Sequence, residues 1–375
     1  MSDQNEKLTY ATSGVDYDAM DPFKRAASKA AASTARNLRN HHGLVEVGWS
    51  RGESAYLIDL DDRYLALVEE GLGTKNLAAD AVYARANRWA DIAQDTVAMI
   101  VNDMATLGAL PYATAMHLAV GESSWFDDGP RAMRLIEGWK KACDLAECAW
   151  GPGETPTLKG NVVPGTVVLS GSAVGAVKDK KRVFRPEKIE AGDAIVLLGS
   201  NGIHANGLTL ARTIAERTGY DARIPNGRAF GDALLDPTPI YVPFIRACLD
   251  WGVDIHYAVN VTGHGWRKLM RAPQPFSYVI DTIPTPQPIF DFMQKEGRID
   301  DREMYGTFNM GAGFALYLPE DEVKKVWDVY YHYRSRDFSW GYGLVNAGHI
   351  EDSEEKKVVI VPRNHTFTAD DLKVR

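Results

Sequence analysis

The sequence predicts a mixed α/β protein, of the α+β kind, built from two domains. Its 375 residues are too many for one typical core and fit two domains. Both halves also contain the same pattern, in which a short apolar strand runs into a glycine-rich segment and a helix follows. We place the boundary near Asp179, which gives domains at 1–178 and 179–375.

The composition predicts a soluble globular protein and argues against two functional classes. Hydrophobic residues make up 45% of the chain and charged residues 25%, and both fractions are ordinary. The formal net charge of -8, without a basic patch, argues against nucleic-acid binding, which depends on clustered lysine and arginine. No apolar leader is present, and no run approaches the ~20 apolar residues that span a bilayer. We therefore expect a cytoplasmic protein that binds neither nucleic acid nor membrane.

The three cysteines are Cys143, Cys148 and Cys248. Their number is odd, and their spacing is not that of metal ligands. Such a pattern indicates a reducing compartment, in which the thiols are buried or idle.

The first half is expected to alternate helices and strands after a loosely held, polar segment at 1–20. Asp21 and Pro22 start a helix well, as N-cap and first helical residue, and this helix should reach Arg39. Strands are predicted at 55–60, 65–68, 112–120 and 166–175, and helices at 91–107 and 130–149.

The second half is expected to begin with a strand at 194–198 and a glycine loop at 199–207. The helix after this loop should end at Gly219. Further helices are predicted at 241–251, 266–271 and 320–331, and further strands at 314–318 and 358–361. The residues after Pro362 are expected to form a polar, mobile tail.

The segment 69–75, Glu-Glu-Gly-Leu-Gly-Thr-Lys, combines groups that suit a metal-bridged phosphate. Glycines let backbone N–H groups approach phosphate oxygens, Lys75 supplies a positive charge, and carboxylates hold the divalent ion. A plain glycine turn after a strand explains this segment equally well when it is taken alone.

Acidic residues recur further along the first half. Asp95 lies two turns before Asn102 on a similar face of an otherwise apolar helix, and Asp103 follows. A carboxylate there is costly unless it is paired or binds a metal, although a capping or solvent-facing role stays open. Glu154 lies in the glycine-rich stretch 151–155, which could bend around a ligand or form an ordinary turn.

Two glycine loops in the second half are candidate anion sites. The loop 199–207 feeds a helix N-terminus, whose N–H groups and positive dipole end favour anions. His204 in this loop could donate a hydrogen bond or transfer a proton, although a lone histidine is more often structural. The segment 261–265 also precedes a helix and is a second candidate cradle.

These segments, in this order, resemble phosphoribosylformylglycinamidine cyclo-ligases, also called aminoimidazole ribonucleotide synthetases. The resemblance covers nearly the whole chain, from Gly14 to the strand at 358–361. In the first half, residues 14–18 are similar to A-G-V-D-I-D, 70–75 to D-G-V-G-T-K, 97–103 to V-A-M-C-V-N-D, 103–111 to D-x4-G-A-x-P and 153–155 to the end of G-G-E-T. In the second half, residues 202–207 match G-x-H-x-N-G, 235–241 resemble L-x-P-T-x-I-Y and 305–311 resemble Y-x-T-F-N-x-G.

The resemblance implies a PurM-like fold of two α/β domains. The sheet of the N-terminal domain would form a barrel at a homodimer interface, and the C-terminal sheet would be covered by helices. The implied reaction uses ATP and Mg²⁺ to phosphorylate the formyl amide oxygen of formylglycinamidine ribonucleotide, after which the amidine nitrogen closes the imidazole ring. Such a reaction depends mainly on positioning and charge neutralisation.

The site residues are carried over from the matching motifs. Mg²⁺ would be held by Glu70, Asp95, Asp103 and Glu154. ATP would contact Glu70, Gly71, Gly73, Thr74, Lys75, Asp95, Asn102, Asp103, Gly108, Gly153 and Thr155. The substrate would lie against Asn206, Gly207, Thr262, Gly263 and Asn309, with its phosphate at Gly207. The implied catalytic residues are His204 near the reacting centre, Lys75 on phosphate, and Glu154.

Four departures from the family pattern concern the ligand pocket. Glu70 replaces an aspartate and is one methylene longer, and Pro152 replaces the first glycine of G-G-E-T. Residues 47–53, which include Trp49, replace the glycine-rich G-L-G-G-F-G, and His264 interrupts T-G-G-G. Two alternatives therefore stay open: a diverged enzyme of the same superfamily that activates another amide or carboxylate oxygen, and a non-catalytic relative.

Overall fold

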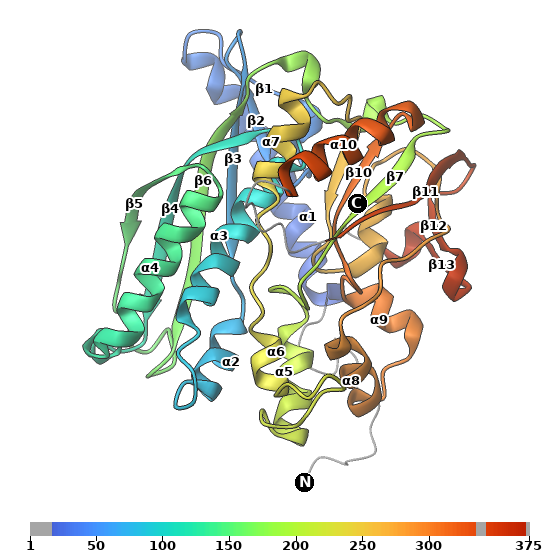
Figure 1. Cartoon of the computed structure of the whole chain (residues 1–375). Helices are drawn as coiled ribbons and strands as arrows, with labels where there is room; N and C mark the ends of the chain where they lie inside the picture. Colours follow the sequence, from blue (N-terminus) through green and yellow to red (C-terminus); the bar gives the residue numbers. More distant parts are fainter. Residues whose placement is uncertain (1–16, 335–342, 373–375) are drawn as a thin grey trace.

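Two β-sheets organise the chain. The computed structural model describes residues 17–334 and 343–372, so the first three residues of the 14–18 motif, and with them most of the polar segment 1–20, lie outside the described part. A six-stranded sheet has the order β1-β2-β3-β6-β4-β5, and a seven-stranded sheet has the order β13-β12-β9-β11-β7-β10-β8. Figure 1 shows the sheets in different halves of the molecule, with α3 between them; α3 packs on β3, β4 and β6 and also touches β8.

The first sheet is antiparallel except for its last pair, in which β5 runs parallel to β4. Its strands are β1 (Val45–Glu46), β2 (Tyr56–Asp59), β3 (Tyr64–Gly71), β4 (Leu110–Val120), β5 (Ala149–Glu154) and β6 (Val167–Val177). The helices of this half are α1 (Tyr17–Thr34), α2 (Lys75–Val82), α3 (Trp89–Ala105) and α4 (Gly129–Leu145).

One face of the first sheet is covered by α3 and α4, and the other is open. A side chain at Gly171 of β6 would meet Ile100 of α3 and Trp139 of α4, so both helices pack over that position. On the opposite face, Leu67 and Val168 remain 40% and 51% exposed. Within the described residues this face therefore presents apolar side chains to solvent.

The second sheet is antiparallel except for the pairing of β12 with β9. Its strands are β7 (Ala194–Gly199), β8 (Tyr257–Asn260), β9 (Phe276–Ile280), β10 (Ala312–Leu318), β11 (Leu344–Asp352), β12 (Lys357–Ile360) and β13 (His365–Thr368). The helices of this half are α5 (Leu208–Thr218), α6 (Phe230–Leu234), α7 (Val242–Asp250), α8 (Pro288–Gly297), α9 (Asp301–Thr307), α10 (Val323–Arg334) and the 3-10 helix η6 (Gly265–Met270). Every residue of β7, β8 and β10 is buried, which explains why these strands are apolar apart from Asn260 at the end of β8.

The expected elements form, but several boundaries differ. Helix α1 begins at Tyr17, so the expected start at Asp21 and Pro22 is wrong, and both residues lie inside the helix. The stretch 151–155, expected to bend as a loop, mostly belongs to β5, an edge strand in which Pro152 is tolerated. The expected mobile tail instead forms β13 and a capped turn, in which Thr368 and Asp371 bond each other's backbone.

No helix within 17–334 or 343–372 is both long and apolar enough to cross a bilayer.

The connector between the sheets, residues 178–193, is held by a buried histidine. His256, just before β8, accepts a backbone hydrogen bond from Arg185 at its carbonyl oxygen, 2.9 Å away. Its ring Nδ1 lies 2.8 Å from Oδ2 of Asp193, which begins the approach to β7. The hydrogen bond with Asp193 raises the pKa of His256, although burial acts in the opposite direction.

This pair predicts a pH dependence of stability. Because the folded-state pKa of His256 lies above its unfolded value of about 6.5, its contribution is fully present below that pH. It is lost as the pH rises through the folded-state pKa. We expect His256→Gln to flatten the fall in the free energy of unfolding above about pH 6.5. Urea titrations across pH would measure this, and the exposed His41 provides the control His41→Gln; identical pH profiles for the two variants would contradict the assignment.

Close packing of α3 on α4 gives a second prediction. A Cβ at Gly138 would lie 2.4–2.8 Å from backbone atoms of Ala90, whereas a Cβ at Gly129 would meet nothing within 4 Å. We expect Gly138→Ala to destabilise the protein by about 1–3 kcal/mol, because two helix backbones would have to separate. Gly129→Ala, in the same helix, should not. Thermal unfolding of both variants tests this, and equal melting temperatures would refute it.

Candidate functional site

A cavity of about 960 Å³ lies between the two halves of the molecule. Helix α1, the loop 48–54 and the facing ends of β3 and α3 contribute walls from the first half, and η6 contributes a wall from the second. Its charged lining mixes both signs and comprises Asp21, Lys24, Arg25, Lys29, Arg51, Glu53, Glu70, Asp103, Glu187, Lys268 and Arg271. Such a lining suits a ligand that carries several negative charges together with a cation.

Two predicted metal ligands, Glu70 and Asp103, meet in this cavity. Burial and, next, the charge of Asp103 raise the pKa of Glu70 to about 7. Asp103 is 7% exposed and accepts a 2.7 Å hydrogen bond from Nδ2 of Asn260. Two adjacent carboxylates repel each other unless a cation or a proton lies between them. Their oxygens fit Mg²⁺, which commonly takes one or two carboxylates and completes its shell with phosphate and water.

Two basic side chains, one in η6 and one at its C-cap, lie beside the two acids. Lys268 donates a hydrogen bond to Oγ1 of Thr262, and burial lowers the pKa of this lysine to about 8 while Asp103 and Glu70 oppose that shift. Arg271 donates to Oγ of Ser54 at 2.9 Å and to the carbonyl oxygen of Gly52 at 2.8 Å. Arg271 therefore fixes the glycine loop of the first half against η6 of the second, next to the acid pair.

Both bulky replacements of family glycines, Trp49 and His264, line this cavity. His264 has a φ of 71°, in the left-handed region that favours glycine. Burial, followed by the charge of Lys268, lowers the pKa of His264 to about 4. The imidazole is therefore neutral near pH 7, and it takes up space that the family motif leaves open.

Lys75 and Asp95 are not at the cavity; they form an ion pair in the junction between the halves. Both side chains are fully buried, and Nζ of Lys75 lies 2.6 Å from Oδ2 of Asp95. Lys75 also donates to the carbonyl oxygen of Asp236 at 2.9 Å, and Oδ1 of Asp95 accepts from the backbone N–H of Thr238 at 2.8 Å. In this structure Lys75 contacts protein groups in place of phosphate, and Asp95 has no oxygen exposed for a metal.

His204 lies in the same junction. It is 2% exposed and adopts a φ of 59°. Burial, with a smaller effect of Lys75, lowers its pKa to about 3, so the ring is neutral. Its Nε2 has no hydrogen-bond partner within the described part of the chain. An orphaned ring nitrogen is costly and marks a position where a ligand or water atom would be accepted.

The predicted substrate residues connect three loops of the second half. Oδ1 of Asn206 accepts a 3.0 Å hydrogen bond from the backbone N–H of Gly263. Asn309 donates to the carbonyl oxygen of Gly202 at 2.8 Å and accepts from Oγ of Ser200 at 2.8 Å. Gly207 has a φ of 71°, and a Cβ there would strike Phe308. The structure therefore brings these residues together through their own hydrogen bonds, with Thr262 beside Lys268 at the edge of the cavity.

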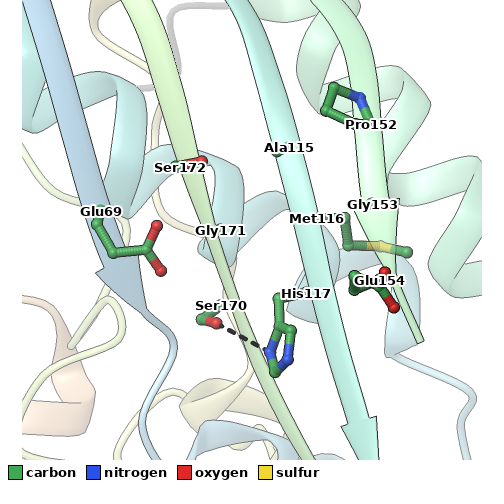
Figure 2. Close-up of a pocket in the computed structure, with 10 residues that line it drawn as sticks. All are labelled: Glu69, Ala115, Met116, His117, Pro152, Gly153, Glu154, Ser170, Gly171 and Ser172. Carbon is green, nitrogen blue, oxygen red and sulfur yellow. Dashed lines mark hydrogen bonds between the residues drawn. The ribbon is translucent and has the colours of Figure 1, made fainter. Parts of the chain in front are cut away.

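Glu154 lies apart from the other predicted metal ligands, on the open face of the first sheet. It lines a separate hollow of about 620 Å³ with Glu69, His117 and Ser170. Figure 2 shows these side chains on neighbouring strands, with Oγ of Ser170 3.5 Å from Nδ1 of His117. Because alternate residues of a strand point to opposite faces, Glu69 lies here while Glu70 lies under α3.

The remaining predicted residues hold backbone in place. Asn102 donates to the carbonyl oxygen of Pro239 and accepts from the N–H of Tyr241, both at 2.8 Å. Gly73 and Gly108 have φ values of 72° and 70°, which side chains rarely adopt. Gly71 and Thr74 flank the turn from β3 to α2, and Gly153 and Thr155 are exposed beside Glu154.

The predicted four-carboxylate metal site is thus not assembled. No group of three or more His, Cys, Asp or Glu side chains among the described residues could hold a metal ion. Asp95 is sequestered by Lys75, and Glu154 projects from the other face of the sheet. We retain Glu70 and Asp103 as the candidate pair.

Sequence reasoning missed Lys268, Arg271 and Asn260. The two basic residues are three positions apart, Lys268 in η6 and Arg271 at its C-cap, and that spacing places them on one side of a 3-10 helix. No sequence pattern points to Asn260, because its hydrogen bond to Asp103 forms only when the fold places β8 beside α3.

Two family models match the chain. The AIR synthase related protein, N-terminal domain, matches residues 52–177, and the AIR synthase related protein, C-terminal domain, matches residues 190–334. A phosphoribosylformylglycinamidine cyclo-ligase of Methanococcoides burtonii is 37% identical over 327 residues, which is 86% of this chain and 92% of that protein. Another, of Methanococcus maripaludis, is 32% identical over 367 residues, 96% of this chain and 98% of that protein. The hydrogenase maturation protein HypE in complex with ATP has a similar fold, with a TM-score of 0.56, 16% identity, and coverage of 81% of this chain and 84% of that chain.

The buried ion pair predicts a large loss of stability when one partner is neutralised. Asp95→Asn would leave the ammonium group of Lys75 buried without its counter-charge, at a cost of about 3–5 kcal/mol. The matched control is Asp144→Asn, whose partner Lys140 lies 2.7 Å away but on the surface, so no measurable change is expected. Denaturant unfolding compares the two. Equal small effects would mean that the Lys75–Asp95 pair does not hold the halves together.

Proposed function

The chain belongs to the AIR synthase related protein family, and from this premise we propose that it is a phosphoribosylformylglycinamidine cyclo-ligase. It converts formylglycinamidine ribonucleotide and ATP into aminoimidazole ribonucleotide, ADP and phosphate, a step of de novo purine biosynthesis. The observation that carries the proposal is the identity of 37% with a cyclo-ligase over 86% of the chain. The cavity supports it, because a carboxylate pair and several cations meet there in one place.

Binding and charge neutralisation are the contributions that these residues make. Glu70 and Asp103 would hold Mg²⁺, which when bound neutralises charge on the transferred phosphoryl group. Lys268, Arg271 and the basic side chains of α1 surround that point and attract phosphate oxygens. Partial burial strengthens these interactions relative to water.

Ring closure itself requires a good leaving group. Water leaves an amide carbon poorly, and phosphate on the amide oxygen makes departure feasible when the amidine nitrogen attacks. The protein supplies orientation of the two nitrogen-bearing ends of the substrate. His204, Lys75 and the glycine loops at 202–207 and 262–263 are proposed to lie against the substrate, which requires the junction between the halves to open enough for a ligand to reach the orphaned Nε2 of His204.

We also propose a cytoplasmic homodimer joined through the open face of the first sheet. The exposed Leu67 and Val168 supply apolar area there, and the hollow with Glu69, His117 and Glu154 would be enclosed by the second copy. Glu154 would then lie within the interface, apart from the Glu70–Asp103 pair. The odd number of cysteines, without metal-ligand spacing, supports a reducing compartment.

The test is turnover of ATP with Mg²⁺, in the presence and absence of formylglycinamidine ribonucleotide, following both ADP and aminoimidazole ribonucleotide. We expect substrate-dependent ADP release matched by aminoimidazole formation, lost on chelation of Mg²⁺ and restored by its return. Glu70→Gln and Asp103→Asn should each lower kcat/KM by roughly 100-fold or more, the loss typical of removing one preorganised electrostatic group.

The control for those variants is Glu137→Gln, an exposed carboxylate on α4 that pairs with Arg134. It should retain full activity. If Glu70→Gln and Asp103→Asn retain activity, the assignment of the metal to this cavity is wrong. Glu154→Gln and His204→Ala are expected to slow the reaction as well. A normal rate for either variant would show that the substituted residue does not belong to the site.

A diverged enzyme of the same superfamily is the second candidate, because Trp49 and His264 line the cavity in segments where the family motifs have glycines. ATP hydrolysis that is indifferent to formylglycinamidine ribonucleotide would favour it. Failure to bind ATP at all would favour a non-catalytic relative.

A further inference from the structure

Helix α4 ends in a turn that brings two cysteines together. The backbone N–H of Cys148 donates to the carbonyl oxygen of Cys143 at 3.0 Å, and the N–H of Glu147 donates to that of Asp144 at 3.2 Å. Glu147 has a φ of 54°, in the left-handed region. These features define a Schellman motif, in which the residue at the start of the last turn and the second residue beyond the helix touch through their side chains. Here both of those residues are cysteines.

The geometry of the turn is compatible with a covalent bond between the two sulfurs. A direct backbone hydrogen bond keeps the two Cα atoms within the ~4.4–6.8 Å that a disulfide spans. The contact usually found in this motif is apolar, and two small, soft side chains would satisfy it without reacting. The surroundings of the two cysteines differ from those of a purely apolar contact.

The two thiols differ in access and in hydrogen bonding. Cys143 is 3% exposed, and its Sγ lies 3.3 Å from Oγ1 of Thr114 on β4. Hydrogen bonds from Cys148 and Thr114 lower the pKa of the Cys143 thiol. The hydrogen bond with Cys143, followed by burial, raises the pKa of the Cys148 thiol. Cys148 is only partly buried and can meet a reagent from solvent. The third cysteine, Cys248, is fully buried, which raises its pKa and shields it from reagents.

We propose that Cys143 and Cys148 form a modification site, a dithiol that low-molecular-weight disulfides oxidise to an intramolecular disulfide. The sulfur of Cys148, which a reagent can reach, passes its proton to the sulfur of Cys143 and attacks the small disulfide. A mixed disulfide forms, and one small thiolate leaves and takes up that proton from Cys143. The thiolate of Cys143 then attacks the sulfur of Cys148, and the second small thiolate leaves. The two cysteine thiols lose two electrons and two protons; the small disulfide gains both and departs as two thiols.

The product would link the end of α4 covalently to the start of β5. Cys148 directly precedes Ala149, the first residue of this edge strand, and the strand carries Glu154 at its other end. The backbone hydrogen bond already holds the turn in the reduced protein, so oxidation would lock the existing geometry. This proposal departs from the sequence-based expectation that the thiols are buried or idle.

The experiment uses the full chain and glutathione disulfide as the oxidant. Residues Ala142 to Lys159 form one tryptic peptide that contains both cysteines, whereas Cys248 lies in another peptide. After oxidation, unfolding and alkylation with iodoacetamide, we expect this peptide to lose both alkylation sites and two hydrogens in mass. Cys248 should remain alkylated. Reduction with dithiothreitol before alkylation should restore all three sites.

Two variants make the result specific. Cys248→Ser should oxidise in the same way as the natural protein, and Cys148→Ser should keep Cys143 available to iodoacetamide after unfolding. The proposal is overturned if the peptide 142–159 of the natural protein keeps both alkylation sites under glutathione disulfide. It is also overturned if the peptide carries only a glutathione adduct. Because both measurements are made on the natural protein, neither depends on the variants folding.

Discussion

The relation between the two halves of the molecule depends on polar contacts buried at their junction. Lys75 and Asp95 come from the first half, and each also binds backbone of the segment 236–238 from the second. Asn102 extends the same attachment to Pro239 and Tyr241. Buried polar groups specify one arrangement because any shift would leave some of them unsatisfied. The walls of the cavity belong to different halves, so this attachment determines how they are placed relative to each other.

The electrostatics of the cavity follow from which face of a strand each residue occupies. Glu69 and Glu70 are neighbours in sequence, yet Glu69 faces the open side of the sheet and Glu70 lines the cavity with Asp103 of α3. The acid pair is therefore partly desolvated, and the cations of η6 and α1 surround it. Binding of a lone cation or a lone anion to such a site is unfavourable, whereas a metal ion and a polyanion that bind together are stabilised there.

Much of the fold could be predicted from the sequence, and less of the site. Apolar periodicity located β7, α3 and α7 within a few residues, because these elements are buried on several sides. Periodicity gave no signal for β5, whose Gly-Pro-Gly stretch has the composition of a loop but lies on a sheet edge. The motifs indicated Glu70 and Asp103, which do meet. They also indicated Asp95 and Glu154, whose separation depends on an ion pair and on strand direction, two tertiary facts that local sequence does not encode.

The order of strands in the second sheet has a consequence for synthesis on the ribosome. Strand β7 is the first strand of the second sheet to leave the ribosome. Its neighbours β10 and β11 lie more than one hundred residues downstream. Until they emerge, the run Ala194–Gly199, which is apolar and uncharged, has both edges unpaired. Such a segment is prone to pair with other nascent chains. Slow closure of the sheet makes this chain a candidate client for chaperones that bind extended apolar strands.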